Sequence, residues 1–252
     1  MALLSLKNVR VAFSGLTALD SISLDAEAGQ VLAVIGPNGA GKSTLFNAIA
    51  GYVPLAGGSI QFDGRDIQGL PIHAISALGM RRSFQNGGVF GAMTTLENVL
   101  TGLSQRIASK PMGLLFGLAG ARRAEAEARE HAVELLHMMG LAAIAHRPAR
   151  ELSAGQQRLV EITRALAARA RLLLLDEPAV GLTSAEREHL MAILRRLCSE
   201  GIAIVLVEHA VDMVMAVSDR IAVLNYGKLI ATGSPQEVRT HPAVLEAYLG
   251  QS

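Results

Sequence analysis

A nine-residue, glycine-rich segment near the N-terminus carries the residue types that bind phosphate. Glycines let the backbone curl tightly and point its N–H groups at an anion, and a lysine adds a mobile cation. An apolar run at 31–35 precedes the segment and a helical pattern at 45–49 follows it, which is the strand, loop and helix order of a nucleoside triphosphate site. This phosphate loop comprises Gly36, Pro37, Asn38, Gly39, Ala40, Gly41, Lys42, Ser43 and Thr44.

A second segment, LSAGQQR at 152–158, opens a helical pattern whose first turn could receive an anion. Apolar residues recur at helical spacing beyond it, at Leu159, Ile162 and Leu166. Ser153 is predicted to be the N-cap of this helix, so the backbone N–H groups of the first turn are available to a bound anion.

Two apolar runs end in groups that can take part in acid–base chemistry. The leucines at 172–175 lead into Asp176 and Glu177, and the run at 202–207 leads into Glu208 and His209. Ligands of α/β proteins bind at the carboxyl ends of such buried strands. Asp176 and Glu177 could instead cap the following helix, and His209 alone could be an ordinary surface histidine. The phosphate loop upstream favours the functional interpretation.

In their order and spacing, these segments resemble the ATP-binding subunits of ABC transporters. The phosphate loop, the LSAGQ signature, the LLLLDEP strand and His209 carry the resemblance, which extends over nearly the whole chain. It implies an α/β fold of the P-loop NTPase (ABC ATPase) type, with a mostly parallel core sheet, a small antiparallel β-subdomain and an α-helical subdomain. The implied activity is ATP hydrolysis coupled to transmembrane transport, with ATP and Mg²⁺ as cofactors.

Phosphoryl transfer requires positioning and charge neutralisation more than covalent chemistry. We expect Mg²⁺ to be held by Ser43, by Gln85 and, through water, by Asp176. Lys42 is expected to neutralise the β- and γ-phosphates, and Thr44 to reach the α-phosphate. Gln85 is selected only by the resemblance.

Glu177, at the end of its strand, could polarise an attacking water molecule. The resemblance implies that it is the general base, and that His209 holds the γ-phosphate and that water. It also places Phe13 where an aromatic ring stacks on adenine, although Phe13 could instead pack in the core.

The resemblance further implies that two ATPase subunits pair head to tail, either as a homodimer or with a homologous subunit. Each signature would close over the ATP of the other subunit. Ser153 and the N–H of Gly155 would grip the γ-phosphate, and Gln156 would also contact the nucleotide. Most ABC ATPases carry Asp where this chain has Thr183. The hydroxyl of Thr183 cannot supply the negative charge of that aspartate, which puts the coupling between the two ATP sites of the pair in question.

The 252 residues are interpreted as a single ABC ATPase domain. The nucleotide-binding core with its antiparallel β-subdomain is assigned to 1–92 and 169–235, the helical subdomain with the signature to 93–168, and a helical tail to 236–252. An insertion at 104–120 has too few apolar residues to span a membrane, so we expect an interfacial or packing role.

Composition excludes several classes of protein. The net charge is +1 with the charges interspersed, which does not indicate nucleic-acid binding, and a single cysteine excludes an internal disulfide framework. The first residues lack the basic front and long apolar centre of a signal peptide, so we expect none, and no apolar stretch approaches the roughly 18 residues that span a bilayer. We expect a cytoplasmic protein, peripheral on the inner face of the cell membrane through integral permease subunits, which an extracytoplasmic solute-binding protein serves indirectly.

Several segments of the chain resemble one particular branch of the family. The segments at 84–98, 207–209, 218–238 and 247–250 resemble the ATPases of high-affinity branched-chain amino acid import systems. Importers of urea, amides and some aromatic acids share these features. A non-transport ABC ATPase would show tandem cores, a coiled-coil insertion or a basic face, and a scaffold that does not hydrolyse ATP would lack Glu177 or His209.

The segment at 84–93 joins Gln85 to apolar residues through three glycines. We expect these glycines to let it move, and Phe90 and Met93 to line the cleft that receives a short cytoplasmic helix of the permease. The alternative is a loop packed in the core.

Overall fold

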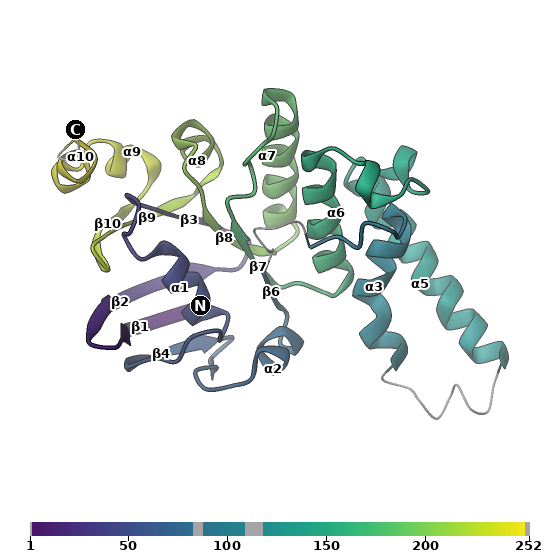
Figure 1. Ribbon diagram of the computed structural model, residues 1–252, viewed down its shortest axis with the longest axis horizontal. Coiled ribbons are helices and arrows are strands. Elements are labelled where there is room, and N and C mark those ends of the chain that lie inside the picture. Colours follow the sequence, from purple (N-terminus) through teal and green to yellow (C-terminus); the bar gives the residue numbers. More distant parts are fainter. Residues whose placement is uncertain (1, 83–87, 109–117, 250–252) are drawn as a thin grey trace. The chain divides into compact units, whose positions relative to one another are not determined.

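The computed structural model describes residues 2–82, 88–108 and 118–249, except for the side chains at 104–108, 118–122 and 249 (Figure 1). The chain forms two compact units. The first unit comprises residues 1–82, 171–179 and 191–252, and the second comprises residues 83–170 and 180–190.

The first unit contains a six-stranded sheet that is parallel except at one edge. β9, β3, β8, β7 and β6 run parallel, and β10 pairs antiparallel with β9. Every residue of β3, β7 and β8 is buried, because a parallel sheet is covered on both faces and its strands are continuous apolar runs. The strand order is β10 (Lys228–Gly233), β9 (Arg220–Asn225), β3 (Val31–Ile35), β8 (Ala203–Val207), β7 (Leu172–Asp176) and β6 (Met80–Arg82).

A second, antiparallel sheet completes the β-structure of this unit. Its order is β2 (Leu16–Glu27), β1 (Ala2–Phe13), β4 (Gly57–Phe62) and β5 (Arg65–Asp66). Ser14 and Gly15, the turn between β1 and β2, both adopt positive φ. The mostly parallel core sheet and the small antiparallel sheet confirm the predicted fold class.

Helices and side chains from both sheets form the main core of the first unit. Leu45 and Phe46 of α1 (Lys42–Ile49) share one buried cluster with Leu6 of β1 and Leu32 of β3. The remaining helices of this unit are α2 (Ile72–Ala77), α8 (Val211–Val217), α9 (Pro235–Arg239), α10 (Pro242–Leu249) and the part of α7 (Ser184–Ser199) that follows Leu190.

The single cysteine, Cys198, lies partly buried in α7. Burial raises the pKa of its thiol to about 12, so the thiol stays protonated at neutral pH. This agrees with a packing role rather than a reactive one.

The second unit is helical. Its elements are α3 (Thr95–Ala108), α5 (Leu118–Met138), the short helices η1 (Ala142–Ile144) and η2 (Ala149–Glu151), α6 (Ala154–Ala167) and the beginning of α7. Gly140, just beyond α5, has a φ of 70°, as expected of a glycine that stops a helix. Most of the insertion predicted at 104–120 lies outside the described residues. Within the described part of the chain, no helix is long and apolar enough to cross a membrane.

Candidate functional site

Strand pairing in the first unit brings three of the predicted segments to one edge of the sheet. β8 lies between β3 and β7, and Val207 at its end is in register with both Val34 and Asp176. Because these strands are parallel, the segments that follow them emerge at the same edge. The phosphate loop, the Asp176–Glu177 pair and His209 are therefore neighbours.

The phosphate loop has the curled backbone that its glycines predict. Gly36, Gly39 and Gly41 have φ values of 152°, 78° and 103°. A Cβ at Gly36 would collide with the carbonyl oxygen of Leu224, so glycine is required there by space as well as by conformation. Gly41 is the N-cap of α1, and the loop therefore leads directly into a helix N-terminus.

Lys42 folds back over this loop. Its side chain is buried, and its Nζ donates to the carbonyl oxygens of Gly36 at 2.7 Å and Pro37 at 2.9 Å. Burial lowers the pKa of the ammonium group, while the charges of Glu177 and Asp176 act in the opposite direction. The two carboxylates are thus close enough to act on the cation of the loop.

The oxygen donors near the loop fit a magnesium ion. Ser43 is exposed in the first turn of α1, and Asp176 supplies a carboxylate. Among the described residues, no three His, Cys, Asp or Glu side chains cluster as a metal site. Mg²⁺ commonly uses only one or two carboxylates together with phosphates and water, so this sparse set suits it. Gln85 lies outside the described residues.

Asp176 has an arginine partner that the sequence did not reveal. It is 1% exposed, and its Oδ2 lies 3.1 Å from Nη2 of Arg82 at the end of β6. Arg82 also donates to Oδ1 of Asn47 at 2.6 Å and lies over the ring of Tyr52. The only signal in the sequence was an arginine shortly before Gln85, with nothing local to link it to Asp176.

Glu177 and His209 are brought together. Nε2 of His209 lies 3.0 Å from Oε1 of Glu177, and both side chains remain partly exposed. Glu177 has a φ of 48°, and its N–H donates to the carbonyl of Val207 at 2.8 Å. The strand end therefore fixes the backbone of Glu177 and aims its carboxylate at the imidazole.

Glu208 is a second residue that sequence reasoning did not select. It is 4% exposed, and its carboxylate accepts the N–H of Ala179 at 2.7 Å and the N–H of His209 at 3.0 Å. Glu208 therefore ties the turn after Glu177 to the segment that carries His209. Its position beside His209 at the end of a buried strand was the available signal.

Phe13 lies at the end of β1, next to the hairpin turn. Its side chain is 46% exposed, which excludes the alternative of a core residue. An exposed ring at this position is available for stacking.

In the second unit, Ser153 is the N-cap of α6, as predicted. Its Oγ accepts the N–H of Gln156 at 3.2 Å, and the side-chain oxygen of Gln156 accepts the N–H of Ser153 at 3.1 Å. Oγ of Ser153 also donates to Oε1 of Glu186 at 2.8 Å. Gly155 lies buried in the first turn of the helix.

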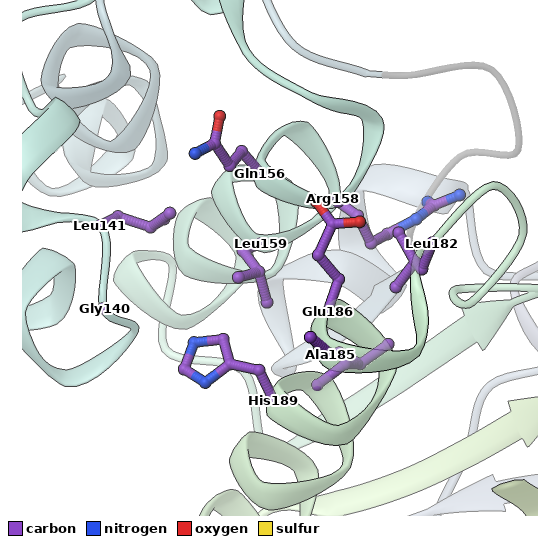
Figure 2. A pocket seen from close by; sticks show the side chains of 11 residues that line it. Gly140, Leu141, Gln156, Arg158, Leu159, Leu182, Ala185, Glu186 and His189 are labelled. Atoms are coloured by element: carbon purple, nitrogen blue, oxygen red, sulfur yellow. The ribbon is translucent and has the colours of Figure 1, made fainter.

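A cavity of about 290 Å³ adjoins this signature segment (Figure 2). Gln156 and Leu159 of α6, Glu186 and His189 of α7, and Leu141 help to line it. All of these residues belong to the second unit.

The described part of the 84–93 segment is fastened to the second unit. The Glu161 carboxylate binds the N–H of Gly88, and Asn98 binds both the N–H and the carbonyl of Phe90, at 2.7 and 3.1 Å. The Phe90 ring is 51% exposed and lies over the Arg164 guanidinium. Residues 88–93 are thus held by side chains of the second unit, and Phe90 is not a core residue. Residues 84–87 lie outside the described residues.

Comparison with known proteins decides the family. The family model described as "ABC transporter" matches residues 19–180. The chain belongs to the ABC transporter family. It is therefore an ATP-binding ATPase, and the family that the sequence indicated is confirmed.

Further similarities narrow the position of this ABC ATPase within the family. A second model, "Branched-chain amino acid ATP-binding cassette transporter", matches residues 228–252. The chain is 41% identical over 251 residues, 99% of its own length and 98% of the relative's, to the high-affinity branched-chain amino acid transport ATP-binding protein BraF of Pseudomonas aeruginosa.

Two solved structures of ATP-binding cassettes are also similar to this ABC ATPase. The ADP conformation of MJ1267 matches with a TM-score of 0.86 and 32% identity, over 99% of each chain. The dimeric post-hydrolysis state of MJ0796, bound to ADP and Pi, matches with a TM-score of 0.74 and 27% identity, over 92% of this chain and 98% of that one.

Proposed function

We propose that this ABC ATPase powers the import of branched-chain amino acids across a cell membrane. The observation that carries the proposal is the match of residues 228–252 to a model specific for branched-chain amino acid transporters. The likeness to BraF over nearly the whole of both chains supports the same substrate class. Within this proposal the whole chain acts as one ABC ATPase domain.

ATP binding rests on the phosphate loop. Lys42 exchanges its carbonyl partners for the β- and γ-phosphates, and the curled backbone and the N-terminus of α1 surround the phosphate chain. Thr44 faces the α-phosphate, and the exposed Phe13 ring stacks on the adenine base.

Hydrolysis rests on the Glu177–His209 pair. Glu177 accepts a proton from the attacking water. His209 forms a hydrogen bond with the Glu177 carboxylate and orients both that carboxylate and the γ-phosphate. Ser43 and Asp176, with Gln85, would hold Mg²⁺, which neutralises the charge that develops on the phosphates. Arg82 holds Asp176 in place through their 3.1 Å ion pair.

The conversion of ATP hydrolysis into motion requires a second ATPase subunit. Two ATPase subunits, identical or homologous, pair so that Ser153, Gly155 and Gln156 of each contact the γ-phosphate bound by the other. Hydrolysis removes that bridging charge and opens the pair. The subunits attach to integral permeases and thereby lie on the inner face of the membrane, while a solute-binding protein delivers the substrate from outside.

Transport assays test this proposal. The chain would be reconstituted in proteoliposomes with the permease subunits and binding protein encoded beside its gene. We expect ATP-dependent uptake of labelled leucine, isoleucine and valine, and no uptake of urea, acetamide or benzoate. Uptake of one of the latter three instead would overturn the substrate, and ATP hydrolysis without any transport would favour a non-transport ATPase.

A further inference from the structure

The hydroxyl of the signature serine is bound by a carboxylate from α7. Oγ of Ser153 lies 2.8 Å from Oε1 of Glu186 and donates its proton to it. The same Oγ accepts the N–H of Gln156, which completes the cap of α6. Both residues belong to the second unit.

Glu186 is itself fixed by the cap of its own helix. Its Oε2 accepts the N–H and the hydroxyl of Thr183, each at 3.0 Å, and Oγ1 of Thr183 accepts the N–H of Glu186 at 3.2 Å. This is a reciprocal capping box at the beginning of α7. Thr183, which differs from the usual aspartate of the family, thus holds a carboxylate three residues further on.

The carboxylate of Glu186 lies against the first turn of α6. A Cβ at Gly155 would lie 2.7 Å from both Cδ and Oε1 of Glu186. Figure 2 shows the Glu186 side chain extending from α7 toward α6. A helix N-terminus attracts anions through its unpaired N–H groups and its dipole, and here a side chain of the same unit is the anion.

This arrangement conflicts with the proposed role of Ser153. A serine hydroxyl has one proton, and an ionised γ-phosphate offers only acceptors. While Ser153 donates to Glu186, it cannot donate to phosphate. Two anions, one from α7 and one from the nucleotide, would also repel each other at the same helix end.

We propose that Glu186 is a positioning residue that occupies the N-terminal end of α6, at the signature. It must release Ser153 before Ser153 can bind the ATP of a paired subunit. This inference rests on the proposed function. Glu186 sets the nucleotide concentration at which two subunits close, and it links the beginning of α7 to the signature.

Two observations support this inference, one on the charge of Glu186 and one on the space beside it. The hydrogen bond from the Thr183 backbone, followed by those from the Ser153 and Thr183 side chains, lowers the pKa of Glu186, which is therefore ionised at neutral pH. The cavity of about 290 Å³ beside Glu186 gives the carboxylate space to turn away while α7 stays in place.

The test measures ATP-driven pairing of the full chain by analytical ultracentrifugation. A Glu177→Gln parent is used so that ATP is not consumed, and Glu186→Gln is added to it. This variant keeps the side-chain length and one acceptor oxygen but removes the charge. We expect half-maximal pairing at about three- to fivefold lower ATP, the size of a charge effect at a helix N-terminus.

Two controls separate this effect from general charge removal. Glu188→Gln removes the same charge from an exposed position of α7 and should pair like the parent. In a Ser153→Ala background, Glu186→Gln should give a smaller gain, because no hydroxyl remains to be released. Glu186→Asp, which keeps the charge but cannot reach as far, serves if the glutamine variant does not fold, and should also pair at lower ATP.

The outcomes distinguish this inference from the proposed function. If the parent binds fluorescent ATP and pairs, but Glu186→Gln needs as much ATP as the parent or more, only the role of Glu186 is overturned. An equal gain with Glu188→Gln would overturn it as well. If the parent neither binds ATP nor pairs, the proposed function falls and the inference falls with it.

Discussion

At the scale of single residues, Lys42 and Glu177 of the candidate nucleotide site lie in different surroundings. Lys42 is buried among loop carbonyls, which hold its ammonium group where phosphates would replace them. Glu177 lies beyond a strand end and contacts His209. We therefore propose that Lys42 serves ATP binding and Glu177 serves turnover, and two substitutions test these roles.

Lys42→Ala should weaken ATP binding by about ten- to a hundredfold, because one charge-assisted contact to phosphate contributes roughly 1.5–3 kcal/mol. Titration with a fluorescent ATP analogue measures the loss. Lys7→Ala, which removes an exposed lysine from β1, should leave the affinity unchanged. An unaltered Kd in Lys42→Ala would contradict the assignment of the phosphate loop.

Glu177→Gln should leave the Kd for ATP nearly unchanged and lower kcat by about 10²–10⁴, because the attacking water loses its proton acceptor. A phosphate-release assay gives kcat. Glu200→Gln, at an exposed position near the end of α7, is the matched control and should keep the wild-type rate. Turnover within a few-fold of wild type in Glu177→Gln would place the base elsewhere.

At the scale of elements, α3, α7 and α9 begin with the same reciprocal hydrogen bonds. Thr94 and Glu97 at α3, Thr183 and Glu186 at α7, and Ser234 and Glu237 at α9 each form a capping box. In every pair the backbone N–H of the capping residue is the main cause that lowers the glutamate pKa. These helix starts are therefore stabilised by charge and depend on pH.

Glu97→Gln isolates this charge at α3. Because the folded-state pKa of Glu97 is below its ordinary value of 4.5, its charge stabilises the fold above that value, and the effect is lost as pH falls through the folded-state pKa. Thermal unfolding should therefore show a higher Tm for wild type at pH 7 and a shrinking difference toward pH 3. Glu130→Gln, at an exposed position of α5, should show no such trend, and a difference that grew in acid would refute the cap.

At the scale of the whole molecule, the functional residues are divided between the two units. Lys42, Glu177 and His209 belong to the first unit and Ser153 to the second, while α7 contributes residues to both. Phe90, in the second unit, presents an exposed ring on a backbone that Asn98 holds. We expect this ring to be an apolar contact for the permease, close in sequence to Gln85.

Phe90→Ala should keep the basal ATPase rate of the isolated chain and reduce transport by the complete system at least about tenfold, as expected of a central aromatic contact. Uptake in proteoliposomes and ATPase activity are measured side by side. Tyr226→Ala, which removes an exposed aromatic ring from the first unit, should spare both activities. Full transport by Phe90→Ala, or loss of its fold, would show that Phe90 is not the coupling contact.

The features that the sequence predicted well are those in which interacting residues are close along the chain. The curl of the phosphate loop follows from the φ values that glycine allows, and the Ser153 cap is completed by Gln156 three residues later. Buried strands follow from apolar runs. Such patterns are local, so residue types and spacing were sufficient to determine them.

Tertiary structure alone decided which groups meet. Arg82 reaches Asp176 across 94 positions because β6 pairs with β7, and His209 reaches Glu177 because β8 lies beside β7. The contact of Ser153 with Glu186 depends on how α7 begins beside α6. Residue types were sufficient to propose phosphate-binding and hydrolytic groups. The partners that hold these groups depend on strand order and helix packing, which arise from the burial of whole elements and leave no local pattern at the residues concerned.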